Sequence, residues 1–374
     1  MKLKKVMLLS IVYLSVVGTA VANEQLSKKI EQFLNKKQLP GMETLIIKDG
    51  KTWHHSAIGN INLTKKNPLN KDSIFRIYSM TKPVTAVALL QLVEQGKLTL
   101  DSYIQDHLPQ LLPFTYNGNH QKVTIRQLLS HTAGFGYDFP LLHNSKTQED
   151  LLSGISGYKL NFKSGDKWAY SLASDIQGAL IESISGEPLD VYLAKNIFNP
   201  LGMKDTSFWV SAQKSSRLVD VYKSKKDMVN LKTLASEDVA YLTQTKFLSA
   251  GGGLVSTATD YGYFLTMLMN QGKYKGKNIL SESLIKMMLT SNTQGLDTGF
   301  LEKIYPNSGF GFGLGIKEKT GDLRAKGSIY WAGKGGTFFW VDPKHNLIVV
   351  AMMQAENAWP KVNAWLGKEV YSLL

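Results

Sequence analysis

Cysteine is missing altogether from this sequence of 374 residues. Its absence excludes disulfide bonds, thiolate zinc sites, iron–sulfur clusters and a cysteine nucleophile. It also excludes a lipoprotein, since the lipid would have to be attached to a cysteine after the export signal. The chain is 43% apolar and long enough to bury a large core, so it needs no cross-links to fold.

Other signatures are missing as well. The sequence has no His-Glu-x-x-His zinc motif, no P-loop and no Gly-x-Ser-x-Gly nucleophile motif. His54 and His55 are neighbours on a predicted strand, where they point to opposite faces and are poorly placed to share a metal ion. The net charge of +13 suggests an anionic partner, but the arginines form no stripe interleaved with aromatic residues. We therefore predict neither a metal site nor nucleic-acid binding.

Basic residues open the chain. Three of the first five residues are lysines, and an uncharged run from Val6 to Asn23 follows them. Within it Ala20-Val21-Ala22 is a small-x-small cleavage pattern, so residues 1–22 are predicted to be an export signal that is removed after Ala22. The mature protein is then expected to be periplasmic or secreted, with no stable membrane insertion. The run is just long enough to span a bilayer, which leaves an uncleaved anchor as the alternative.

Strand-like segments lie near both ends of the chain. Near the N-terminus two such segments flank Asp49-Gly50, a dipeptide typical of tight hairpin turns. Near the C-terminus four segments are rich in aromatic and β-branched residues. The predicted strands are Met42–Lys48, Thr52–Ile58, Gly309–Ile316, Ser328–Ala332, Thr337–Val341 and Leu347–Gln354. Strands from the two termini predict one antiparallel sheet, flanked by helices, and an α+β fold.

The pattern between these strands is mostly helical. A helix is predicted from near Ser79 to Gln95, because Pro83 is tolerated only in the first turn of a helix. Further predicted helices are Ile125–Ser130, Ser174–Ser185, Leu189–Phe198, Thr259–Asn270, Ser281–Leu289 and a terminal helix from about Val362. We accordingly divide the chain into a sheet domain, residues 23–85 and 300–374, and an inserted, mainly helical domain, residues 86–299. The active site is expected at their junction.

A serine followed three residues later by a lysine is the main candidate for chemistry. The pattern occurs five times, at Ser79, Ser156, Ser164, Ser211 and Ser283. Only Ser79 lies where a strand-like run, Ser73–Tyr78, leads directly into a predicted helix. The helix N-terminus there stabilises negative charge, and the i, i+3 spacing puts Lys82 on the same face. A nucleophilic serine needs such a mount and a nearby base. The alternative is that Ser79 simply caps the helix.

Lysine alone is a poor base at neutral pH unless it is desolvated or faces another cation. A phenolic partner would therefore strengthen the case for Lys82. Tyr170 follows a turn-like segment and precedes the helix predicted from Ser174, a position from which it can reach a cleft. The alternative for any single tyrosine among the 16 present is a place in the core.

Six motifs, in order along nearly the whole mature chain, resemble those of the serine hydrolases related to class C β-lactamases. They are Ser79-Met80-Thr81-Lys82, Leu128-Leu129-Ser130-His131-Thr132-Ala133-Gly134, Tyr170-Ser171, Pro200-Leu201-Gly202-Met203, Gly251-Gly252-Gly253-Leu254-Val255-Ser256-Thr257 and Trp331-Ala332-Gly333. This superfamily includes penicillin-binding peptidases and family VIII carboxylesterases. The resemblance implies a β-lactamase/transpeptidase-like fold and catalysis without a metal or cofactor.

The resemblance also implies residue roles. Ser79 would be the acylated nucleophile, and Lys82 with Tyr170 would remove its proton, Lys82 being charged when Tyr170 is deprotonated. The backbone N–H groups of Ser79 and Lys334 would form the oxyanion hole, Lys334 lying on an edge strand. Substrate-binding positions carried over from the motifs are Ser171, Leu172, Trp331 and Gly333.

Two departures from the β-lactamase pattern bear on the substrate. Leu172 stands where β-lactamases have an asparagine, and Trp331 stands where they have the lysine of Lys-Thr-Gly. Lys334 is not expected to replace that lysine, because side chains alternate along a strand and Lys334 should face away from Trp331. An apolar, uncharged wall favours small acyl esters, so we predict a carboxylesterase. The alternatives are a β-lactamase or D-amino-acid peptidase acting on cell-wall peptides, and a noncatalytic envelope-binding homologue.

Overall fold

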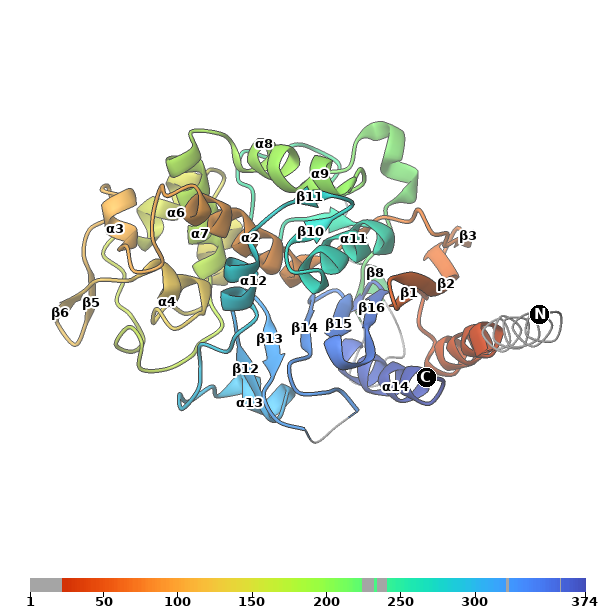
Figure 1. Ribbon diagram of the computed structural model, residues 1–374. Coiled ribbons are helices and arrows are strands. Elements are labelled where there is room, and N and C mark those ends of the chain that lie inside the picture. The colour runs from red at the N-terminus through yellow and green to blue at the C-terminus, as the bar shows by residue number, and fades with distance from the viewer. Residues whose placement is uncertain (1–21, 224–231, 234–240, 321–322, 357) are drawn as a thin grey trace.

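The computed structural model describes residues 22–223, 232–233, 241–320, 323–356 and 358–374. At its centre is an eight-stranded antiparallel sheet, in the order β12-β13-β14-β15-β16-β1-β2-β3 (Figure 1). These strands are β1 (Gly41–Lys48), β2 (Lys51–Asn62), β3 (Asn67–Pro68), β12 (Ser308–Phe310), β13 (Gly315–Lys317), β14 (Ile329–Ala332), β15 (Phe338–Asp342) and β16 (Leu347–Met352).

The pairing of β1 with β16 joins the two ends of the chain. Its antiparallel register runs from Glu43 opposite Met352 to Lys48 opposite Leu347. The N-terminal hairpin thereby continues the sheet that the C-terminal strands begin. The predicted α+β fold, with a sheet built from both terminal segments, is confirmed.

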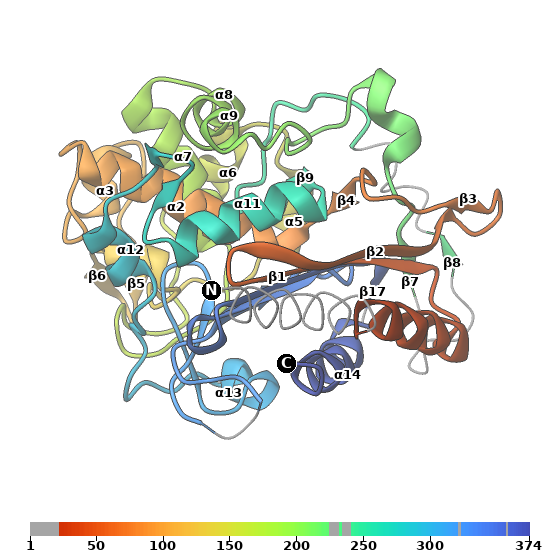
Figure 2. The same ribbon diagram turned by 45° about the vertical axis from the view of Figure 1, so that its right-hand side comes forward.

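At the centre of this sheet both faces are buried, as the residues along β16 show. Val349 and Ala351 belong to the core shared with the helix at residues 22–37 and with α14 (Trp359–Tyr371). Ile348 and Val350 belong to the larger core on the opposite face, where α11 (Ala258–Met269) packs. Figure 2 shows α14 and the N-terminal helix on one side of the sheet and α11 on the other. A strand buried on both faces reads as an uninterrupted apolar run, as this one does.

The helical part of the protein surrounds α2 (Thr81–Glu94), which packs against α7 (Ala173–Ser185). Helix α2 is buried over most of its circumference, as expected of a helix that is apolar on all sides. The remaining helices are α3 (Ile104–His107), α4 (Ile125–Leu129), α5 (Phe139–Asn144), α6 (Gln148–Ile155), α8 (Leu189–Leu193), α9 (Asn199–Leu201), α12 (Glu282–Met288) and α13 (Phe300–Ile304). Among the described residues, no helix is long and apolar enough to cross a membrane.

Two local predictions need correction. The segment Gly309–Ile316 is not one strand: Gly313 has a φ of 78°, and the chain reverses there between β12 and β13. Helix α2 does not begin at Ser79 but at Thr81, after the 3₁₀ turn Tyr78–Met80. Pro83 nevertheless lies in the first turn of α2, as its geometry requires.

The predicted export signal falls almost wholly in residues 1–21, which lie outside the described residues.

One buried hydrogen bond ties the sheet side of the protein to the turn that carries Ser79. Tyr261 of α11 donates its hydroxyl proton to the Met80 carbonyl at 2.9 Å, and its ring packs on Phe339 of β15. We expect Tyr261→Phe to lower the free energy of unfolding by about 1–3 kcal/mol, because the Met80 carbonyl loses its buried donor. Urea denaturation measures this loss. Tyr263→Phe, at a half-buried position on the same helix, is the matched control, and an equal loss in both variants would contradict this assignment.

Candidate active site

Ser79 lies in a short 3₁₀ turn, Tyr78–Met80, that leads directly into α2. Tyr78 has a φ of 43°, a left-handed conformation that is unusual for a bulky residue. Backbone conformations of this kind persist where the surrounding structure enforces them, and they are concentrated at functional sites. Ser79 is half-buried, and neither the 3₁₀ turn nor α2 has a side-chain cap hydrogen bond. The capping interpretation of Ser79 is therefore not supported.

The ammonium of Lys82 is fully buried next to Ser79. Its Nζ donates to the Gly251 carbonyl at 2.6 Å and to Tyr137 Oη at 3.1 Å, and it lies 3.4 Å from Ser79 Oγ. Burial by itself lowers the pKa of Lys82, but the nearby Tyr137, Tyr170 and Asp175 outweigh it and raise that pKa above its ordinary value. Lys82 therefore stays protonated at neutral pH and can donate to Ser79 Oγ and stabilise a neighbouring phenolate.

Tyr170 lies above Lys82, with its ring centroid 4.7 Å from Nζ. Trp331 Nε1 donates to Tyr170 Oη at 3.2 Å, and the two rings are 5.3 Å apart. The structure thus brings Ser79, Lys82, Tyr170 and Trp331 together from three separate segments of the chain.

A second tyrosine, Tyr137, also contacts Lys82, and sequence reasoning missed it. Burial raises the pKa of Tyr137 to about 12 despite the opposing effect of Lys82, so Tyr137 remains a phenol near neutral pH. Its ring stacks on Phe139 at 4.7 Å and lies 5.4 Å from Tyr170. Nothing in its sequence neighbourhood distinguishes it from the other tyrosines, because its role depends on where the chain passes over α2.

Asp175 of α7 holds the loop that receives Lys82. Its Oδ1 accepts from Ser249 Oγ at 2.7 Å and from the Gly251 N–H at 3.1 Å, and it is fully buried. A Cβ on Gly251 would lie 2.5 Å from Asp175 Oδ2, so only glycine fits this close approach. Asp175 is therefore a positioning residue, since it fixes the carbonyl to which Lys82 donates.

The turn after β14 brings Lys334 to the same place. Gly333 packs against the Ile77 carbonyl and Gly335 against the Tyr78 ring, which sets the Lys334 backbone beside the turn that carries Ser79. The expectation of an edge strand is wrong, because β14 lies between β13 and β15. Within the described residues, however, the β13–β14 ladder ends at Tyr330, so the end of β14 carries no further pairing on that side. The Lys334 ammonium pairs with Glu356 at 3.0 Å.

Three of the predicted substrate-binding side chains are buried, and Trp331, at 4% exposed, is one of them. Leu172 is fully buried in the core at the start of α7, and Ser171 is 1% exposed. Ser171 contacts His131 twice: its N–H donates to Nδ1 at 3.2 Å, and its hydroxyl lies 3.0 Å from the same atom. The side chains of Ser171 and Leu172 therefore do not line a cleft in this structure. They lie just after Tyr170, where they anchor its segment.

Two exposed aromatic residues border the Lys82 cluster instead. Phe300 of α13, 46% exposed, lies 6.3 Å from the Tyr170 ring, and Phe139, 66% exposed, stacks on Tyr137. Phe300 belongs to residues 294–308, whose composition gives no sign of such a role. Phe139 and Phe300 give the site an apolar rim. Among the described residues, no group of three or more metal-ligating side chains is found.

Comparison with known proteins places this geometry in a family. The family model described as Beta-lactamase matches residues 26–368. The chain belongs to the beta-lactamase family. It is therefore a hydrolase of the beta-lactamase/transpeptidase-like fold, and hydrolases of this kind act on small-molecule substrates.

Several known proteins are similar to this chain. Protein Rv1367c of Mycobacterium tuberculosis is 28% identical over 347 residues, which cover 84% of this chain and 86% of that protein. Esterase EstB of Burkholderia gladioli is 30% identical over 230 residues, or 56% of this chain and 57% of EstB. The solved structure titled EstCE1, a hydrolase with promiscuous acyltransferase activity, has a TM-score of 0.83 at 25% identity and covers 94% of this chain and all of that one.

Asp175 offers a test of how this beta-lactamase-family site is held. We expect Asp175→Ala to lower kcat at least about 10-fold, because Gly251 loses the acceptor that fixes it and Lys82 loses a nearby negative charge. Asp175→Asn keeps an acceptor for Ser249 and Gly251, so it should retain more activity than the alanine variant. Steady-state ester hydrolysis, with KM and kcat separated, measures both. Wild-type kcat in Asp175→Ala would show that Asp175 does not position Lys82.

Proposed function

We propose that this protein is an exported serine carboxylesterase that hydrolyses small acyl esters through an acyl-enzyme on Ser79. The observation that carries the proposal is the buried, charged Lys82 held between Ser79 Oγ and two tyrosines. The Tyr170 ring lies on this ammonium, so we infer that Tyr170 is the group that accepts the Ser79 proton.

The reaction follows from these placements. Ser79 Oγ attacks the ester carbonyl while its proton passes to Tyr170, and the backbone N–H groups of Ser79 and Lys334 stabilise the developing oxyanion. The bond to the alcohol breaks as Tyr170 returns the proton to the leaving oxygen, which leaves the acyl group on Ser79. A water molecule then attacks the acyl-enzyme, gives one proton to Tyr170 and releases the carboxylic acid, after which the proton returns to Ser79.

The surroundings of the site favour esters over anionic substrates. A β-lactam or a peptide C-terminus brings a carboxylate, which a site recognises with a cation. In this chain Trp331 occupies the position where β-lactamases have the lysine of Lys-Thr-Gly, and the Lys334 ammonium is bound to Glu356. The aromatic rim of Phe139 and Phe300 suits an apolar acyl group. The names of the relatives EstB and EstCE1 add support.

A β-lactamase or D-amino-acid peptidase is the second candidate, favoured by the family match itself. A noncatalytic envelope-binding role is the third, and membership of a hydrolase family speaks against it. Export rests on the three early lysines, the uncharged run and Ala20-Val21-Ala22 alone. All three candidates place the mature protein in the periplasm or outside the cell.

Intact-mass detection of an acyl-enzyme tests the nucleophile and the substrate class together. After mixing with a short p-nitrophenyl ester, the protein should gain the mass of one acyl group, and Ser79→Ala should gain none. Ser211→Ala is the matched control, because Ser211 has the same Ser-x-x-Lys spacing at an exposed position. A stable adduct with a penicillin and none with the ester would favour the second candidate, and no adduct with either would favour the third.

The two tyrosines should behave differently when each is replaced by phenylalanine. Tyr170→Phe should slow acylation by about 100-fold or more, as expected for the loss of a positioned base. Tyr137→Phe should lower kcat by no more than about 10-fold and leave the shape of the pH–rate profile between pH 6 and pH 9 unchanged, because a phenol with a pKa of about 12 does not titrate there. Stopped-flow acylation across that pH range measures both. Unchanged acylation in Tyr170→Phe would assign the base role elsewhere.

A further inference from the structure

His131 lies just after α4, in the motif Leu128–Gly134, none of whose side chains the proposed reaction uses. It is only 1% exposed, and its φ of 57° places it in the left-handed region, which is uncommon for a residue with a side chain. A buried, polar residue held in such a backbone conformation indicates a functional constraint.

His131 accepts hydrogen bonds from the residues on both sides of Tyr170. The Ala169 N–H donates to the His131 carbonyl at 3.0 Å, and the Ser171 N–H donates to His131 Nδ1 at 3.2 Å. The imidazole ring also lies 5.2 Å from the Tyr170 ring. A single residue thus holds the backbone before and after Tyr170 and packs against the side chain between them.

This arrangement needs a neutral imidazole. Because Nδ1 accepts the Ser171 N–H, the ring proton lies on Nε2, which faces Ser174 Oγ at 3.5 Å. Burial, together with the positive charge of Lys82, lowers the pKa of His131 well below its ordinary value. His131 therefore stays neutral and acts as a hydrogen-bond acceptor. Its two ring nitrogens face Ser171 and Ser174.

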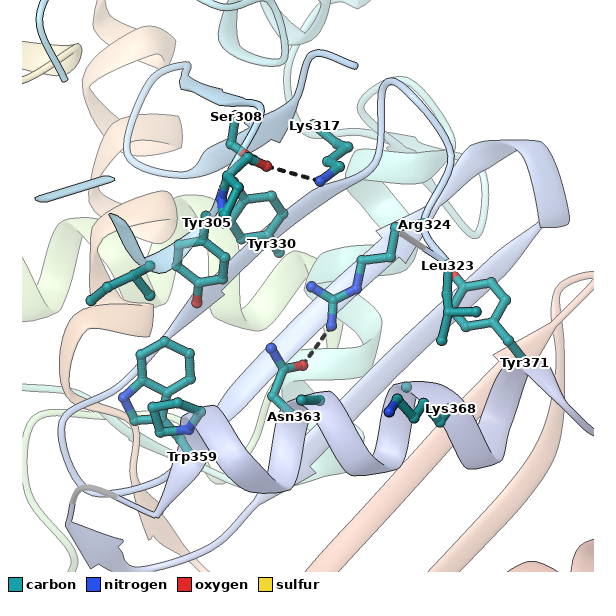
Figure 3. Close-up of a pocket in the computed structure, with 15 residues that line it drawn as sticks. Tyr305, Ser308, Lys317, Leu323, Arg324, Tyr330, Trp359, Asn363, Lys368 and Tyr371 are labelled. Atoms are coloured by element: carbon teal, nitrogen blue, oxygen red, sulfur yellow. Dashed lines mark hydrogen bonds between the residues drawn. The ribbon is translucent and has the colours of Figure 1, made fainter. Parts of the chain in front are cut away.

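The other neighbours of the Tyr170 ring are packed less completely. Phe300 is 46% exposed. Trp331 donates to Tyr170 Oη, but behind it, with ring centroids 6.2 Å apart, Tyr305 lines a pocket of about 530 Å³ beneath α14 (Figure 3). An open volume gives the side chains around it no atoms to pack against on that side. The fully buried contact of Tyr170 with His131 is therefore the one best able to fix its place.

We propose that His131 is a positioning residue, which holds Tyr170 over Lys82 and beside Ser79 by accepting from the N–H groups of Ala169 and Ser171. This inference rests on the proposed role of Tyr170 in acylation and deepens it. A displacement of about 1 Å is enough to slow a reaction about 100-fold, so an anchor that never touches the substrate can still control the rate.

Two amide variants separate the acceptor at Nδ1 from the polarity of the side chain. His131→Gln carries its amide near the place of Nε2 and leaves the Ser171 N–H without an acceptor, so stopped-flow acylation should slow at least about 10-fold. His131→Asn carries its oxygen near the place of Nδ1 and should acylate within about 3-fold of wild type. KM should change less than kcat, because His131 is not at the substrate.

Folding is controlled by two further variants and by melting temperatures. His131→Leu is a second variant without an acceptor, and its apolar side chain suits the core. Thr132→Val is the matched control: Thr132 is also buried, and its hydroxyl lies 2.9 Å from Ser130 Oγ. It should lose stability but acylate like wild type. Assays are run well below the melting temperature of each variant, so that loss of folded protein does not contribute.

Adding Tyr170→Phe shows whether His131 acts through Tyr170. In that background His131→Gln should slow acylation by less than about 2-fold, because the residue that it positions has already lost its hydroxyl. Equal slowing in both backgrounds, wild-type acylation in His131→Gln and His131→Leu, or an asparagine variant no faster than the glutamine variant would each overturn the inference alone. Unchanged acylation in Tyr170→Phe by itself would overturn the proposed role of Tyr170 and this inference with it.

Discussion

The burial of one positive charge organises the active site of this protein. An isolated ammonium in an apolar interior would lose its proton, because desolvation penalises the charged form. Lys82 avoids this through the Gly251 carbonyl, Tyr137 and the nearby Asp175 carboxylate. These partners come from three separate parts of the chain. Only the folded protein therefore holds a charged lysine next to Ser79. The chemistry that we propose for Tyr170 depends on the same charge.

The sheet supplies the other half of the site. The turn that carries Ser79 lies beside the end of β14, a strand of the sheet that β1 and β16 join. The ladder between β13 and β14 stops at Tyr330, which frees the following residues to approach Tyr170 and the Ser79 turn. Gly333 and Gly335 allow this approach, since a side chain at either position would collide with Ile77 or Tyr78. The short β13–β14 ladder and the two glycines thus allow the turn after β14 to lie close to the turn that carries Ser79.

Aromatic residues connect the two faces of the sheet. Trp331, which bonds Tyr170, lies 6.2 Å from the ring of Tyr305, and Tyr305 in turn lines the pocket beneath α14. The aromatic wall of the active site and that of the pocket beneath α14 are therefore parts of one packed cluster.

Local sequence patterns were enough to predict much of the fold and part of the active site. The dipeptide Asp49-Gly50 predicted the N-terminal hairpin, aromatic and β-branched residues predicted the C-terminal strands, and Pro83 predicted the start of a helix close to that of α2. The order of six short motifs predicted the family and singled out Ser79, Lys82, Tyr170 and Trp331, which the structure brings together. These features depend on residues close in sequence or on motifs that recur in the same order.

Only the tertiary structure decided the rest. Tyr137, Asp175 and Phe300 join the site because distant segments cross α2 and Tyr170, and no local pattern encodes such crossings. The burial of Ser171 and Leu172 likewise depends on His131 and on the core around α7. The reversal of the chain at Gly313 and the pocket beneath α14 arise from packing between elements far apart in the sequence. Residue types indicate which reaction is possible, but packing between distant segments sets the distances that the reaction needs.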